Sequence, residues 1–217
     1  CQLAADWNLE YQKDRAGNVL VRVPATPGHE QVPGIILQAH LDMVCEKNSD
    51  IQHDFKHDPI RPVIDGDWVK ASGTSLGADN GIGVATCLAV MEDRSLVHGP
   101  LECLFTVDEE TGLTGAYQLK KDLLKGEILI NLDSEDEGTF TIGCAGGADS
   151  ELSLPVERKT RKARNLLQVS LKGLRGGHSG LDINLGRGNA IKLLARLLAE
   201  AGSKFKFELI SFNGGSK

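Results

Sequence analysis

Short, almost continuously apolar runs that stop at acidic or histidine residues constrain the fold of this chain most. Four of them recur, at 34–39, 101–107, 127–132 and 139–143. Such runs are typical of strands buried on both faces of a sheet. Helical patterns lie between them, at 80–92 with Asp79 in the N-cap position, and at 114–125. Strands alternating with helices predict an α/β fold with a central, mostly parallel (mixed) sheet flanked by helices.

The pattern changes after residue 147. Segments 151–156, 165–171 and 206–212 have the composition of strands, and 189–201 has the period of an amphipathic helix. This β-β-α-β order predicts a small α+β domain. We therefore expect one domain at 1–147 and the N-terminal part of a second at 148–217.

Charge and cysteine content exclude several classes of function. The net charge is -6 and the pI is about 5.5, and no basic stretch contains interleaved aromatic residues, so we expect neither nucleic acid nor an anionic membrane as a partner. The five cysteines include no C-x-x-C pair, which argues against a disulfide framework and a thiolate zinc site. Without a signal peptide or an apolar run of transmembrane length in this sequence, we expect a cytoplasmic protein.

His40 and Asp42 directly follow the first apolar run. Residues i and i+2 of an extended strand project to the same side, so the imidazole and the carboxylate would lie together at the strand end. A carboxylate that holds the ring of a histidine is a common arrangement at metal sites. On its own, however, such a pair is more often a polar strand end.

Further carboxylates follow the other runs or begin a helix: Asp79, Glu109, Glu110 and Asp133. In open α/β sheets, ligands bind beyond the carboxyl ends of the strands. One imidazole and several carboxylates without a thiolate suit a hydrolytic zinc, cobalt or manganese site. Glycines on both sides of Asp79 suit it to bridging two metals, whereas the alternative is an N-cap role alone.

Glu109 and Glu110 are adjacent carboxylates at the end of a predicted buried strand. Their mutual repulsion favours a bound cation or a shared proton. Because adjacent side chains diverge, one can bind a metal while the other acts as general base on a water molecule. Alternatively, both occupy the first turn of a helix, where the helix dipole stabilises them.

Other motifs carry less information. His53 and His57 have the spacing of a metal-binding pair, but prolines follow and no helical period is present, which favours an exposed loop. The glycine-rich segment 77–83 lacks the preceding strand and spacing of a phosphate-binding loop. No nucleophile elbow surrounds Ser72, Ser75 or Ser179.

The order of these motifs resembles one family of enzymes. The motifs are His40-x-Asp42, Asp79, Glu109-Glu110, Asp133 and Gly176-Gly177-His178-Ser179-Gly180. They resemble the co-catalytic zinc metallopeptidases that include aminoacylases, glutamate carboxypeptidases and several dipeptidases. Segments 71–83, 108–116, 176–180 and 186–190 are similar to the aminoacyl-histidine (Xaa-His) dipeptidase branch, and the likeness covers nearly the whole chain.

The resemblance implies two divalent metal ions, with zinc as first choice and cobalt or manganese as alternatives. His40 and Asp133 would bind one metal, Asp79 would bridge, and Glu110 would bind the other. The family's last metal ligand, a histidine, is expected beyond residue 217, so we expect this segment alone to be inactive.

The resemblance also implies roles in catalysis. Glu109 would be the general base, and Asp42 would orient the metal-binding histidine. His178 would belong to a lid domain and stabilise charge on the scissile carbonyl, although without the family context it is an ordinary turn residue. The family arrangement allows a homodimer through the lid.

The expected function is that of a metal-dependent dipeptidase acting on Xaa-His and related dipeptides. One alternative is an N-acyl-amino-acid deacylase or an aminopeptidase with the same chemistry. Another is a catalytically silent binding or scaffold protein with the same fold.

Overall fold

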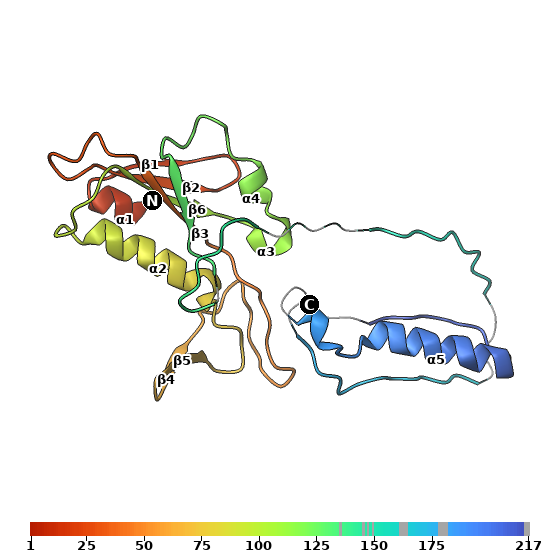
Figure 1. The fold of residues 1–217 in the computed structure, drawn as a ribbon. Coiled ribbons are helices and arrows are strands. Elements are labelled where there is room, and N and C mark those ends of the chain that lie inside the picture. Colours follow the sequence, from red (N-terminus) through yellow and green to blue (C-terminus); the bar gives the residue numbers. More distant parts are fainter. Residues whose placement is uncertain are drawn as a thin grey trace. The chain divides into compact units, whose positions relative to one another are not determined.

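The computed structural model describes residues 1–134, 136–144, 146, 148, 150–160, 165–177 and 182–214 (Figure 1). The chain divides into two compact units, Cys1–Gly147 and Ala148–Lys217, which are described separately. None of the helices in the described ranges combines the length and the apolar character needed to cross a membrane.

A five-stranded mixed sheet forms the centre of the first unit, in the order β1-β2-β6-β3-β7. Strand β3 is parallel to both β6 and β7, whereas β2 is antiparallel to β6 and to β1. The strands are β1 (Glu10–Lys13), β2 (Val19–Val23), β3 (Ile35–His40), β6 (Leu101–Thr106) and β7 (Ile128–Asn131). The predicted mixed α/β sheet is therefore confirmed, including the three strands that precede the candidate site residues.

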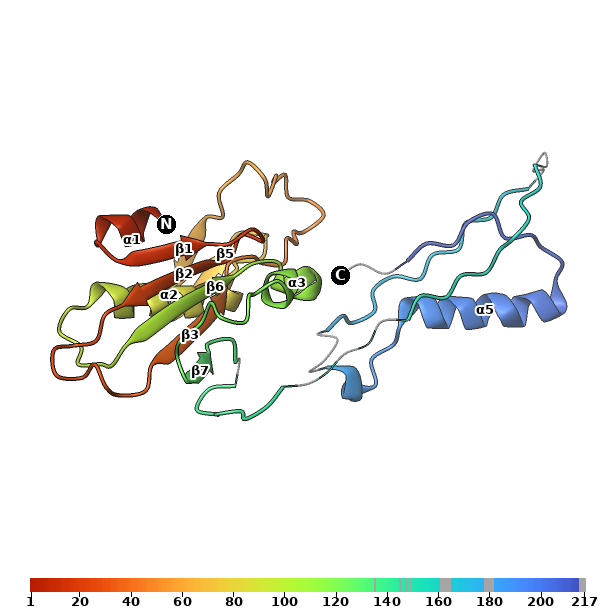
Figure 2. The same ribbon diagram turned by 90° about the horizontal axis from the view of Figure 1, so that it is seen from above.

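A long helix lies behind the strands of this sheet in Figure 2, and an apolar cluster lies on each face of the sheet. Helices α1 (Gln2–Asp6) and α2 (Ala78–Glu92) pack on one face, where Cys87 and Met91 of α2 join a buried cluster from β2 and β6. On the other face, Leu123 packs with buried residues of β2, β3 and β6. Strand β6 is buried along its length and β3 is half-buried to buried, as their continuous hydrophobic runs predict. Strand β7, at the end of the strand order, is exposed along its length, so the burial predicted for the run at 127–132 is wrong.

The carboxyl ends of β3, β6 and β7 lie at the same edge of the sheet because the three strands are parallel. His40 pairs with Thr106 in the register, and the N–H of Leu41 donates to the Thr106 carbonyl over 2.8 Å. Two short helices, α3 (Glu109–Gly112) and α4 (Thr114–Tyr117), follow β6 directly. Segments far apart in sequence therefore meet at this edge.

A second, two-stranded sheet consists of β4 (Pro62–Asp65) and β5 (Trp68–Ala71), which form a hairpin (Figure 1). Its apolar residues are exposed, Ile64 at 81% and Trp68 at 70%. The segment that contains His53 and His57 lies before it and has no helix or strand, as expected for a loop.

Three further local predictions for the first unit are wrong. Residues 139–143 form no strand, and Phe140 and Ile142 are almost fully exposed, so the run has no neighbouring strand to pair with among the described residues. The predicted helix at 114–125 is only the single turn of α4, followed by turns. Asp79 is not the N-cap of α2: its side chain contacts His40, and the side chain that accepts from the first turn is that of Asn80, bonded to the N–H of Gly83.

The second unit contains the 3-10 helix η1 (Ile183–Leu185) and the helix α5 (Ala190–Lys204). The Asn189 side chain caps α5 by accepting a hydrogen bond of 2.9 Å from the N–H of Lys192, so the predicted helix is present. The segments expected as strands, 151–156, 165–171 and 206–212, all lie within the described ranges and have no strand pairing there. Their apolar residues are largely exposed, Leu152 at 92% and Leu167 at 89%, so strand-like composition is present without ladder hydrogen bonds.

Candidate metal centre

His40 ends strand β3 and is buried, with 2% of its surface exposed. Its Nδ1 lies 2.9 Å from the backbone oxygen of Asp42, which can only accept a hydrogen bond. That contact places the proton of the neutral ring on Nδ1 and leaves the lone pair of Nε2 free. A histidine held in this way is prepared to ligate a metal through Nε2.

Two carboxylates converge on this Nε2 atom. Oδ1 of Asp79 lies 3.0 Å from it and Oδ1 of Asp133 lies 3.5 Å from it. An unprotonated Nε2 and two carboxylates repel one another, so the arrangement requires a positive charge between them, either a proton or a metal cation. His40, Asp79 and Asp133 therefore form one group that can hold a cation.

The same charges shift the ionisation of the site. Burial lowers the pKa of His40, but the hydrogen bond to Asp79 and the negative charges of Asp133 and Asp42 outweigh it, and the pKa is raised overall. Burial and the neighbouring Asp79 raise the pKa of Asp133 to about 6, against the opposing effect of His40. A bound cation would favour the ionised form of these carboxyl groups.

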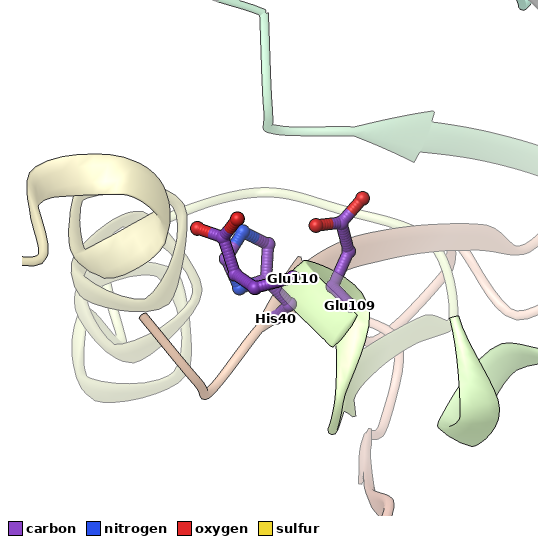
Figure 3. Close-up of side chains that lie close together, drawn as sticks. All are labelled: His40, Glu109 and Glu110. Carbon is purple, nitrogen blue, oxygen red and sulfur yellow. The ribbon is translucent and has the colours of Figure 1, made fainter. Parts of the chain in front are cut away.

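Glu109 and Glu110 occupy the first turn of α3, as one of the two sequence interpretations expects. Figure 3 shows that both carboxylates project to the same side as His40 and diverge from one another. The three residues form a second group whose ligand atoms lie within 4.8 Å of one another. Burial raises the pKa of Glu110, and the charges of Asp79 and Glu109 add to this effect.

Asp42 joins His40 to this pair. Its two carboxylate oxygens accept hydrogen bonds of 3.1 Å from the N–H groups of Glu109 and Glu110. These N–H groups begin α3 and have no partner within the helix. The orienting contact to His40 comes from the backbone oxygen of Asp42, while its carboxylate oxygen lies 3.5 Å from Nδ1.

Asn80 is a site residue that the sequence interpretation missed. Its side-chain amide is buried, donates to Oδ1 of Asp133 over 2.6 Å and accepts from the N–H of Gly83 over 3.0 Å. The backbone of Asn80 is non-helical, so its side chain caps the regular turns of α2 that follow. An asparagine at the start of a helical pattern, a residue type that favours the N-cap, was the signal that could have identified it.

His178 lies outside the described residues, so its expected role stays a prediction. The structure brings together the other six predicted residues in the first unit: His40, Asp42, Asp79, Glu109, Glu110 and Asp133.

The donor set fits divalent metal ions. It consists of one buried imidazole nitrogen and several carboxylates, and no basic side chain of the described residues pairs with these carboxylates. Nitrogen and oxygen ligands of this kind suit zinc, cobalt or manganese. The fold and the site together define a candidate centre for divalent metal ions at the carboxyl edge of a mixed α/β sheet.

Comparison with known proteins identifies the family. Residues 36–214 match peptidase family M20/M25/M40, and the chain belongs to this metal-dependent family. Over 214 residues the chain is 51% identical to the cytosol non-specific dipeptidase of Escherichia coli (strain K12), an alignment that covers 98% of this chain and 44% of the relative.

Two solved peptidase structures are also similar to this chain. The aminoacylhistidine dipeptidase from Vibrio alginolyticus superposes with a TM-score of 0.63 at 45% identity, covering 94% of this chain and 42% of that protein. The aminopeptidase PepT from Bacillus cereus gives a TM-score of 0.52 at 26% identity, covering 62% of this chain and 36% of that protein. The chain thus spans less than half the length of these relatives.

Proposed function

We propose that the full-length protein containing this chain is a metal-dependent dipeptidase that hydrolyses Xaa-His and related dipeptides. The observation that carries the proposal is the convergence of Asp79 and Asp133 on Nε2 of His40, beside the Glu109–Glu110 pair. The similarity to a non-specific dipeptidase and an aminoacylhistidine dipeptidase supports the substrate class. The name of the first relative also supports a cytoplasmic location.

The proposed metal ligands follow the arrangement of the side chains. His40 and Asp133 would hold one ion, Asp79 would be shared, and Glu110 would contribute to a second. Such ions lower the pKa of a water molecule and polarise a carbonyl group. Zinc is the proposed metal, with cobalt and manganese as alternatives that also accept nitrogen and oxygen ligands.

Glu109 is the proposed general base. It would accept a proton from the attacking water as the water oxygen bonds to the peptide carbonyl carbon. The same proton would pass to the peptide nitrogen as the C–N bond breaks, which returns Glu109 to its carboxylate form. Asp42 supports this role because it fixes the N–H groups of both Glu109 and Glu110.

Replacing the base tests the mechanism. In the full-length protein, Glu109→Ala should retain metal but lose turnover of dipeptides by several orders of magnitude, while the exposed Glu127→Ala keeps both. Metal content is measured by elemental analysis and turnover by release of free histidine. Near-normal turnover by Glu109→Ala would remove this residue from the mechanism.

The similarity to an aminopeptidase supports a second candidate, cleavage of longer peptides or acylated amino acids by the same chemistry. Comparing kcat/KM for dipeptides, tripeptides and N-acyl amino acids separates the candidates. A metal content near zero in the folded full-length protein would instead favour a catalytically silent scaffold role.

A further inference from the structure

The segment 107–115, which carries Glu109 and Glu110, is attached at both ends to a single buried side chain. Asn18, 1% exposed, accepts a hydrogen bond from the N–H of Val107 over 3.1 Å and donates one to the carbonyl of Gly115 over 2.9 Å. The sequence separations are 89 and 97 residues. One carboxamide therefore joins the two ends of the segment to the turn between β1 and β2.

Asn18 is itself held rigidly. Its Nδ2 donates to Oδ2 of Asp14 over 2.7 Å, and Oδ1 of Asp14 accepts from the N–H groups of Gly17 and Asn18, each over 2.9 Å. The amide oxygen and both amide hydrogens of Asn18 thus have partners. A buried amide with every polar atom paired specifies one arrangement of the groups it joins.

The backbone around α3 needs such support. Asp108 and Leu113, which flank α3, have φ angles of 62° and 58°, in the left-handed region that side chains other than glycine rarely adopt. Conformations of this kind persist only when the surroundings impose them. Gly115 is required for the contact, because a Cβ there would overlap Oδ1 of Asn18 and the backbone of Val107.

We propose that Asn18, supported by Asp14, is a positioning residue that sets where Glu109 and Glu110 lie relative to His40. Asp42 fixes the middle of the same segment through the N–H groups of both glutamates, and Asn18 fixes its ends. Asn18 touches neither group of candidate metal ligands, so it acts through the segment alone. The inference rests on the proposed function for its catalytic consequence.

A double variant removes the hydrogen bond to Gly115 and keeps the contact between positions 14 and 18. Combining Asp14→Asn with Asn18→Asp exchanges the donor and the acceptor between the two side chains, so the contact between positions 14 and 18 is kept. The carboxylate at position 18 can still accept from the N–H of Val107, but the carbonyl of Gly115 loses its donor. The retained contact limits the loss of stability. Gly115→Ala is a second variant, because its Cβ would meet both Oδ1 of Asn18 and the Val107 backbone, where Asn18 holds the two ends of the segment together.

A matched control comes from a similar buried network elsewhere in the sheet. Glu102, 5% exposed, accepts from the N–H groups of Lys125 and Gly126 over 2.7 and 2.9 Å, so it also attaches a loop to β6. Glu102→Gln should lower Tm without affecting Glu109 and Glu110. Each variant is made in the full-length protein and compared at the same interval below its own Tm.

We expect the double variant and Gly115→Ala to weaken zinc binding by about ten- to a hundredfold, as for other residues that support metal ligands. Hydrogen exchange at the amides of Glu109 and Glu110 should accelerate, and kcat at saturating zinc should fall with KM little changed. Glu102→Gln should show none of these effects. Zinc affinity and amide exchange in the two variants equal to those of Glu102→Gln would overturn the proposal.

These readouts separate the inference from the proposed function. Zinc affinity by chelator competition and hydrogen exchange by mass spectrometry require no turnover. If the wild-type protein hydrolyses no dipeptide, the proposed function fails, while zinc affinity and exchange still decide for or against Asn18.

Discussion

Asn80 donates a hydrogen bond of 2.6 Å to Asp133, although the two residues lie 53 positions apart in the sequence. Asp133 is also within 3.5 Å of the His40 Nε2 atom, so Asn80 determines the orientation of a candidate metal ligand. We predict that Asn80→Ala lowers zinc affinity by about ten- to a hundredfold, the usual effect of losing a partner of a ligand. Competition with a chromophoric chelator measures this.

Thr86→Ala is the control for Asn80, since Thr86 lies on the exposed side of the same helix and only donates to the Ile82 carbonyl. It should bind zinc as the wild type does. Equal zinc affinities for the wild type, Asn80→Ala and Thr86→Ala would show that Asn80 has no effect on Asp133.

Asp42→Asn tests the attachment of α3. An amide has one acceptor oxygen in place of two, so the N–H of either Glu109 or Glu110 loses its partner. Leaving such a donor unpaired costs about 1–3 kcal/mol, and we expect kcat to fall by about tenfold or more as the two glutamates become mobile. Steady-state kinetics and Tm measure both effects.

The corresponding change at Asp65, which pairs with Lys70 on the exposed β4–β5 hairpin, should alter neither quantity. If Asp42→Asn lowered Tm but left kcat at the Asp65→Asn level, Asp42 would have a structural role only.

Removing metal should destabilise the protein. The candidate ligands come from four separate segments, and an ion that binds only the folded state adds about 2.7 kcal/mol at a free concentration of 100 Kd. Dialysis against a chelator should therefore lower Tm, and zinc should restore it. His40→Ala should show a Tm that no longer responds to zinc, and a full zinc response in that variant would contradict the assigned site.

Zinc affinity should decrease with falling pH. The raised pKa of Asp133, about 6, favours its protonated form in the metal-free fold, as the raised pKa of His40 favours the imidazolium. For the metal-free protein, the contribution of Asp133 to stability is therefore present below its ordinary pKa and is lost as pH rises through about 6. Metal binding needs the deprotonated groups, so the two effects have opposite signs.

Calorimetric titration at about pH 5 and about pH 7.5, on either side of the raised pKa of Asp133, measures this dependence. We expect weaker zinc binding at the lower pH and release of protons on binding, detected with buffers of different ionisation enthalpy. Equal affinity at both pH values, without proton release, would show that the ion does not contact these groups.

The strands that carry the site could be predicted because their signal is local. The runs that became β3, β6 and β7 are apolar on both faces, and the first two place His40 and Glu109 at a common edge. The run at 139–143 has the same composition but no partner strand among the described residues, and pairing depends on the whole chain rather than on composition.

The supporting polar contacts could not be predicted in the same way. Asn18 had no feature beyond that of a turn residue, because its partners lie 89 and 97 positions away. The proximity of Asp42 to His40 followed from strand geometry, but its contacts with the start of α3 depend on how β3 lies beside β6. The Asp42 carbonyl contacts His40, whereas its carboxylate contacts the start of α3. Only the tertiary structure determines which oxygen makes which contact.

Zinc binding depends on the register of β3 against β6, in which His40 lies opposite Thr106. Side chains alternate along a strand, so a slip of one residue would turn the imidazole toward α2 and bring Ala39 or Leu41 to the site. A slipped sheet would still contain strands and helices of the same length, which is what circular dichroism detects. Zinc uptake would then be lost in full, which makes it a more sensitive test of correct strand alignment than circular dichroism.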